Sequence, residues 1–183
     1  MTALPKHKMT VDEYLAWAEG RPGRFELYAG SVYAMTPERA GHAKVKYTVQ
    51  TALLRAIERS GLPCHMLPDG MTVRVEQDTA HEPDALVYCG EELPASAVEV
   101  PTPVIVVEVL FPSTQQVDAS AKLVGYFRVA SVHHYLIVDP DKRLVIHHGR
   151  AETDVVTTRI VRDGTLRLDP PGLELVMLEF FPM

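Results

Sequence analysis

The stretch Val104-Ile105-Val106-Val107-Glu108-Val109-Leu110 decides the fold of this chain. It is almost continuously apolar and rich in β-branched residues, which is typical of a central strand buried on both faces of a sheet. Helical patterns precede and follow it, so the sequence predicts a mixed α/β fold with one sheet flanked by helices. One residue is out of character, because a charge at Glu108 is costly in such a strand unless it is paired or bound to a cation.

Helical and extended patterns can be followed outward from this strand. We expect helices over about residues 10–20, 41–60 and 116–130. We expect strands over about residues 25–28, 31–35, 71–75, 85–88, 104–110, 134–138, 144–148, 154–161 and 165–168. Three hairpins are predicted, joining 25–28 to 31–35, 134–138 to 144–148, and 154–161 to 165–168. The apolar tail, residues 173–181, is expected to dock on the domain.

Length and composition predict a single domain over residues 1–183. Apolar residues make up 46% of the chain and charged residues 23%, which is ordinary globular usage. The first residues lack the apolar core of a signal peptide, and no apolar run approaches the length of a membrane span. We therefore expect a cytoplasmic protein without a membrane partner.

The net charge of −6 argues against a protein that coats nucleic acid, but not against an enzyme that contacts it at one patch. Basic residues on the 41–60 helix could form such a patch, although we interpret them as a solvated face: Lys44, Lys46, Arg55 and Arg59. The two cysteines, Cys64 and Cys89, show no metal-binding spacing, and we interpret them as reduced thiols.

A second carboxylate stands at the start of a strand. Asp84 opens the short apolar run 85–88, where a strand end can direct a side chain into a cleft. If the two strands are neighbours, Asp84 and Glu108 can converge on one hard cation, and Mg²⁺ prefers one or two carboxylates with water. Alternatively, Asp84 caps a turn and Glu108 pairs with a buried arginine or lysine.

Phosphodiester hydrolysis at such a site also needs a fixed cation. Residue 110, which shares a face with Glu108, is Leu110, so the nearest candidate is Lys122 on the following helix. The alternative for Lys122 is an exposed pair with Asp118 one turn earlier. Tyr126, one turn after Lys122, could line the same cleft, but we interpret it as a half-buried packing residue.

Two earlier residues are further candidates. Glu26 lies in an apolar stretch, and His42 lies at the start of the 41–60 helix. His42 could meet phosphate or orient a carboxylate, or it could simply be an exposed polar residue of the first turn.

These features occur in a characteristic order along the chain. They are Phe25-Glu26-Leu27-Tyr28-Ala29-Gly30, His42, Pro83-Asp84, Val106-Val107-Glu108-Val109-Leu110, Pro112-Ser113-Thr114, Asp118, Lys122, Tyr126 and Tyr135-Leu136-Ile137-Val138-Asp139-Pro140. Together they resemble the Uma-two family of restriction endonucleases, within the PD-(D/E)XK nuclease superfamily. The resemblance covers about Met9 to Arg150.

The resemblance implies a restriction-endonuclease-like core, an α/β (α+β) fold with a central mixed sheet flanked by helices. It implies metal ligands at Asp84 and Glu108, a relocated catalytic lysine at Lys122 and a further carboxylate at Glu26. It also implies a homodimer. The chain departs from the family at Phe111, where a serine is usual, but this change removes no proposed ligand.

Three functional hypotheses follow. The first is an endonuclease that uses Mg²⁺ or Mn²⁺ to hydrolyse phosphodiester bonds of nucleic acid, with DNA as the expected substrate. The second is a retired nuclease fold that binds nucleic acid or a protein partner without cutting. The third is an unrelated hydrolase, because the residue types of a triad are present, but no nucleophile elbow surrounds the serine: Ser113, His133, His134 and Asp139.

Overall fold

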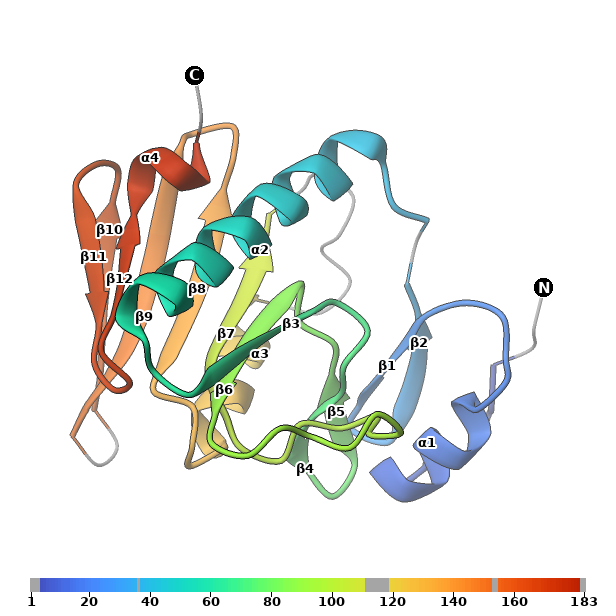
Figure 1. The fold of residues 1–183 in the computed structure, drawn as a ribbon. Helices are drawn as coiled ribbons and strands as arrows, with labels where there is room; N and C mark the ends of the chain where they lie inside the picture. Colours follow the sequence, from blue (N-terminus) through green and yellow to red (C-terminus); the bar gives the residue numbers. More distant parts are fainter. Residues whose placement is uncertain (1–3, 36, 111–118, 153–154, 182–183) are drawn as a thin grey trace.

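A computed structural model describes residues 4–35, 37–110, 119–152 and 155–181, and a six-stranded mixed sheet lies at its centre (Figure 1). In spatial order its strands are β10 (Val155–Val161), β9 (Leu144–Glu152), β8 (His134–Asp139), β7 (Pro103–Val109), β6 (Ala85–Cys89) and β3 (Cys64–Pro68). β7 and β8 are parallel, whereas the other neighbours are antiparallel. β7 has a strand on each side, which confirms the predicted central strand and the mixed α/β class.

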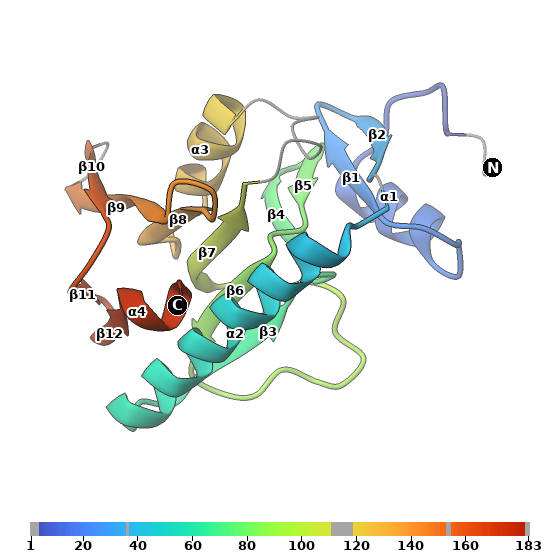
Figure 2. The same ribbon diagram turned by 90° about the horizontal axis from the view of Figure 1, so that it is seen from above.

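Helices cover both faces of this sheet. α2 (Ala40–Ser60) crosses one face, and α3 (Ala119–Arg128) lies on the other, as the view from above shows (Figure 2). Because side chains alternate along a strand, Val107 and Val109 pack in the cluster that includes α2, and Val106 packs in the cluster that includes α3. Glu108 shares the parity of Val106, so its side chain is directed toward α3.

A second sheet extends the molecule on the N-terminal side. Its spatial order is β2 (Ser31–Ala34), β1 (Phe25–Tyr28), β5 (Thr79–His81) and β4 (Val73–Glu76). α1 (Val11–Ala18) packs on it, and Thr10 and Glu13 form a capping box at the start of this helix. The hairpin between β1 and β2 was predicted, but β3 and β5 were not.

The C-terminal segment corrects one predicted hairpin. β10 pairs with β9, whereas β11 (Thr165–Leu168) pairs with β12 (Leu173–Val176) in a separate two-stranded sheet. The turn at Gly164 exists, with a φ of 72°, but the chain leaves the main sheet there instead of pairing back. The tail docks as expected, since α4 (Met177–Phe180) packs against α2 and Glu179 pairs with Arg59.

The cysteines also differ from expectation. Cys64 and Cys89 are directly opposite each other on β3 and β6, and their sulfur atoms are bonded at 2.01 Å. The interpretation as two reduced thiols is therefore wrong, because the strand register brings together residues that are 25 positions apart. Within the described ranges, no helix is long and apolar enough to span a membrane.

Candidate metal centre

The Glu108 carboxylate receives two hydrogen bonds from α3. Oε1 of Glu108 accepts from Nζ of Lys122 at 2.8 Å and from the hydroxyl of Tyr126 at 2.8 Å. Lys122 and Tyr126 are one helical turn apart, so both side chains reach the same point on β7. The charge in the central strand is thus paired with a lysine, as one of our alternatives required.

Lys122 joins the two sheets. Besides Glu108, its ammonium donates to Oε1 of Glu26 on β1 at 2.9 Å. The same Glu26 oxygen accepts from the backbone N–H of Glu82 at 3.2 Å. Asp118, the alternative partner considered for Lys122, lies outside the described residues. Lys122 therefore holds together two of the three candidate carboxylates.

Asp84 is fixed beside the end of β7. β6 and β7 are antiparallel neighbours with Ala85 opposite Val107, which fulfils the condition that the two strands be adjacent. Oδ2 of Asp84 accepts the backbone N–H of Val109 at 2.8 Å, and the Asp84 side chain is largely buried. The side-chain amide of Gln50 on α2 donates to the Asp84 carbonyl at 2.9 Å. Asp84 thus has partners on both β7 and α2.

His42 closes the α2 side of the site. It is buried, and its Nε2 hydrogen-bonds the Val109 carbonyl at 3.2 Å and lies 3.6 Å from Oδ2 of Asp84. Its Nδ1 lies 3.0 Å from a carboxylate oxygen of Glu38. The interpretation of His42 as an exposed polar residue is wrong, because the side chain is buried. Its position fits a residue that orients a carboxylate, and contact with phosphate stays a prediction.

Tyr126 is more buried than expected. It has no exposed surface, and its ring packs against Tyr135 with centroids 5.0 Å apart. The half-buried position was therefore wrong, because the hydroxyl gains a partner in Glu108 and the ring a place in the core. Contact of Tyr126 with substrate stays a prediction.

The position of Lys46 also differs from the prediction. Lys44, Arg55 and Arg59 are exposed as expected, but Lys46 is 4% exposed. Its ammonium pairs with Asp69 at 2.7 Å and lies 3.8 Å from Oδ1 of Asp84. The signal was its position, since residue 46 falls on the same face of the helix as His42, Val49 and Leu53.

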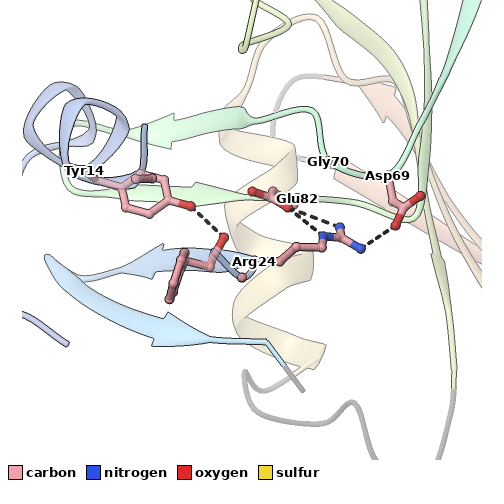
Figure 3. Close-up of a pocket in the computed structure, with 8 residues that line it drawn as sticks. Tyr14, Arg24, Asp69, Gly70 and Glu82 are labelled. Carbon is pink, nitrogen blue, oxygen red and sulfur yellow. Dashed lines mark hydrogen bonds and ion pairs between the residues drawn. The ribbon is translucent and has the colours of Figure 1, made fainter. Parts of the chain in front are cut away.

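Asp69 connects Lys46 to a small cavity beside the site. The cavity has a volume of about 320 Å³, and Tyr14, Arg24, Gly70 and Glu82 are among its lining residues. Figure 3 shows the Arg24 guanidinium between the carboxylates of Asp69 and Glu82, each of which it pairs with.

The electrostatics of the site follow from burial and from the crowding of carboxylates. Burial raises the pKa of Glu108 to about 7, with Asp84 and Glu26 adding to the rise and Lys122 opposing it. Burial alone would lower the pKa of Lys122, but the charges of Glu108 and Glu26 outweigh it and raise that pKa. Burial likewise opposes protonation of His42, but the Asp84 carboxylate beside it raises the His42 pKa.

The donor set fits a hard divalent cation. Glu108, Asp84 and Glu26 supply only oxygen, and burial raises the pKa of Glu108 even though Lys122 lies beside it. Among the described side chains, no group of three or more His, Cys, Asp or Glu residues is arranged so that it could hold a metal ion. Mg²⁺ does not need such a group, because it binds one or two carboxylates and keeps several waters.

The residues of the alternative hydrolase triad are not brought together. His134 and Asp139 are the first and last residues of β8, so their backbones are roughly 16 Å apart. Their side chains have other partners, His147 for His134 and Lys142 for Asp139. Ser113 lies outside the described residues. The described part of the chain therefore does not support a hydrolase of this type.

Comparisons with known proteins identify the family and the fold. The chain is 24% identical over 177 residues to the uncharacterized protein slr1290 of Synechocystis sp. (strain ATCC 27184 / PCC 6803 / Kazusa), covering 96% of this chain and 92% of that protein. The fold of this chain is similar to that in the crystal structure of "a putative nuclease belonging to DUF820 from Anabaena variabilis ATCC 29413". The TM-score is 0.72 and the sequence identity 15%, and the match covers 94% of this chain and 97% of the Anabaena chain. The sequence model of the Uma2 family, described as "Putative restriction endonuclease", matches residues 11–179. The chain therefore belongs to the Uma2 family, and this membership supports a nuclease function in general terms.

Proposed function

We propose that this protein is a divalent-metal-dependent endonuclease that hydrolyses phosphodiester bonds of DNA. The observation that carries the proposal is the buried Glu108 carboxylate, which is held by Lys122 and Tyr126 and lies on the strand next to Asp84. Metal dependence, the DNA substrate and a homodimer that addresses both strands all belong to this proposal.

Asp84 and Glu108 would hold the Mg²⁺ or Mn²⁺ ion. When bound, the cation supplies Lewis-acid stabilisation of the charge on the phosphate and makes water a stronger nucleophile. Neighbouring groups of the chain hold these two carboxylates in place. The Val109 N–H fixes one oxygen of Asp84, and the Tyr126 hydroxyl fixes one oxygen of Glu108.

Lys122 would be the fixed cation of the reaction. It stands between Glu108 and Glu26, so its ammonium can stabilise negative charge on the phosphate without a reorganisation step. Glu26 holds the ammonium in place and is our candidate acceptor for the proton of the attacking water. Four residues thus have distinct roles: ligands at Asp84 and Glu108, a charge stabiliser at Lys122 and a base at Glu26.

The test is nicking of supercoiled plasmid with Mn²⁺ or Mg²⁺, next to an EDTA control. Asp84→Asn and Lys122→Met should each abolish nicking, whereas Lys44→Met, which removes an exposed lysine of α2, should not. Thermal unfolding of each variant shows whether it is folded. Nicking by a folded Asp84→Asn variant at the wild-type rate would overturn the assignment.

One observation favours the retired binding module as a second candidate. Lys122 and Lys46 already compensate part of the carboxylate charge, so the site can persist without a cation. The discriminating property is metal affinity, because a retired site has no need to bind Mn²⁺. Absence of both Mn²⁺ binding and nicking would favour the module.

A further inference from the structure

Lys46 is a second buried lysine beside the candidate metal centre. Its neighbours on the outer face of α2, Lys44 and Tyr47, are exposed, and Tyr47 is 72% exposed. Burying an ammonium group is costly unless it is paired, and Lys46 has carboxylate oxygens of Glu38 at 2.5 Å and Asp69 at 2.7 Å. Its third acidic neighbour is Asp84, at 3.8 Å.

The Asp84 carboxylate has a neighbour at each of its oxygens. Oδ2 accepts the Val109 N–H and faces His42, and Oδ1 faces Lys46. The backbone of β7 contacts only Oδ2, through the Val109 N–H. Any restraint on Oδ1 must therefore come from residues of α2. Of the two α2 residues, Lys46 is the one that faces Oδ1.

Lys46 is in turn held by an alternating chain of charges. Asp69 is shared with Arg24, as Figure 3 shows, and Arg24 also pairs with Glu82. The backbone N–H of Glu82 donates to Glu26. This chain of contacts connects the Asp84 side of the site to the Glu26 side.

We propose that Lys46 is a positioning residue whose ammonium fixes the orientation in which the Asp84 carboxylate would hold the cation for the reaction. This inference rests on the proposed function. Its rival is a purely structural role, in which Lys46 only neutralises Glu38 and Asp69.

Introducing the same Lys46 substitution into two proteins, the wild type and a double variant, separates the positioning role from the structural role. In the Glu38→Gln/Asp69→Asn background, both acids that a structural Lys46 would neutralise are gone, while Asp84 remains. Lys46→Met is then introduced into the wild type and into this background, which isolates the contact with Asp84. Methionine keeps an unbranched apolar stem of similar length and removes the charge. Lys44→Met is the matched control on the same helix.

The first readout needs no activity. The Val109 amide donates to Asp84 at 2.8 Å, so its ¹H–¹⁵N signal in the metal-free protein reports the orientation of that carboxylate. We expect Lys46→Met to shift this signal in both backgrounds and Lys44→Met to leave it in place. A Val109 signal that does not move in the Glu38→Gln/Asp69→Asn background would overturn the inference.

The second readout separates kcat from metal affinity. A misplaced ligand costs reaction rate even when the cation still binds, so Lys46→Met should lower kcat at saturating Mn²⁺ by about tenfold or more in both backgrounds. Mn²⁺ affinity, measured by calorimetry, should not fall with it, because removing a positive charge beside Asp84 does not weaken attraction for a cation. An unchanged kcat in the Glu38→Gln/Asp69→Asn background would also overturn the inference.

The two proposals can fail separately. If the Val109 signal moves but wild-type protein neither nicks DNA nor binds Mn²⁺, the proposed function fails although Lys46 orients Asp84. If wild-type protein nicks DNA and the Lys46 substitutions change neither readout, the nuclease stands and the role of Lys46 is structural.

Discussion

Replacing Glu108 with glutamine is expected to make the metal-free protein more stable relative to wild type at pH 8 than at pH 5. Burial, together with Asp84 and Glu26, raises the pKa of Glu108 in the folded protein from 4.5 to about 7. For a group whose folded-state pKa is raised, the stability it contributes is present in full below the unfolded value and is lost as pH rises through the folded value. Ionisation of Glu108 therefore lowers the unfolding free energy of the metal-free protein at pH 8.

The size of this loss in unfolding free energy follows from the unfolded-state and folded-state pKa values of Glu108. A rise from 4.5 to about 7 corresponds to about 3 kcal/mol of unfolding free energy, lost at about 1.4 kcal/mol for each pH unit between them. Glutamine does not titrate, and its amide oxygen can still accept from Lys122 and Tyr126. The difference in stability between Glu108→Gln and wild type should therefore grow by about 2 to 3 kcal/mol between pH 5 and pH 8.

Urea unfolding in EDTA at pH 5 and pH 8 measures this difference directly. Glu58→Gln, an exposed position on α2, is the matched control for the removal of any one glutamate. Mn²⁺ at pH 8 should then stabilise wild type and not Glu108→Gln, because only the carboxylate serves as a ligand. A stability difference that is the same at pH 5 and pH 8 would refute the reasoning.

Three other perturbations have defined outcomes. Tyr126→Phe removes a hydrogen bond to the Glu108 carboxylate worth about 1.5 to 3 kcal/mol, so the pKa of Glu108 should rise further. The pH midpoint of Mn²⁺ binding should then move up by about one to two pH units. An unchanged midpoint would contradict this prediction. The pKa of His42 is raised in the folded protein, so the stability that His42 contributes is present below pH 6.5 and is lost as pH rises through the folded-state pKa. His42→Gln should therefore lower the unfolding free energy more at pH 6 than at pH 9. Urea unfolding that shows the reverse order would contradict this prediction. Reduction of the Cys64–Cys89 bond should lower the unfolding free energy by about 2 to 4 kcal/mol, a loss that Cys64→Ser should reproduce without reductant; equal stability of oxidised and reduced protein would contradict this.

The fold was predictable where the local pattern is strong. The continuous apolar run at 104–110 and the stripe along 41–60 identified β7 and α2, because burial on two faces or on one helix face leaves a periodic trace. The short strands β3 and β5 leave little periodicity, so they were missed. The hairpin predicted at Gly164 failed because a turn signal does not say which strand the chain meets next.

The site was predictable where a charge stood out from an apolar surrounding. Glu108 and Asp84 could be found in this way, and Lys122 followed from the need for a nearby cation. Lys46 was missed because a lysine on a helix is usually solvated, and its partner Asp69 lies 23 residues away in a turn. The Cys64–Cys89 bond was missed for a related reason, since it depends on the register of two strands.

Calorimetric titration of Mn²⁺ into the metal-free protein tests the central claim most directly. We expect one saturable site in wild-type protein and none in Asp84→Asn or Glu108→Gln, with Lys44→Met binding as wild type does. Wild-type protein that takes up no Mn²⁺, or variants at Asp84 and Glu108 that bind it as wild type does, would contradict a metal centre built from these two carboxylates.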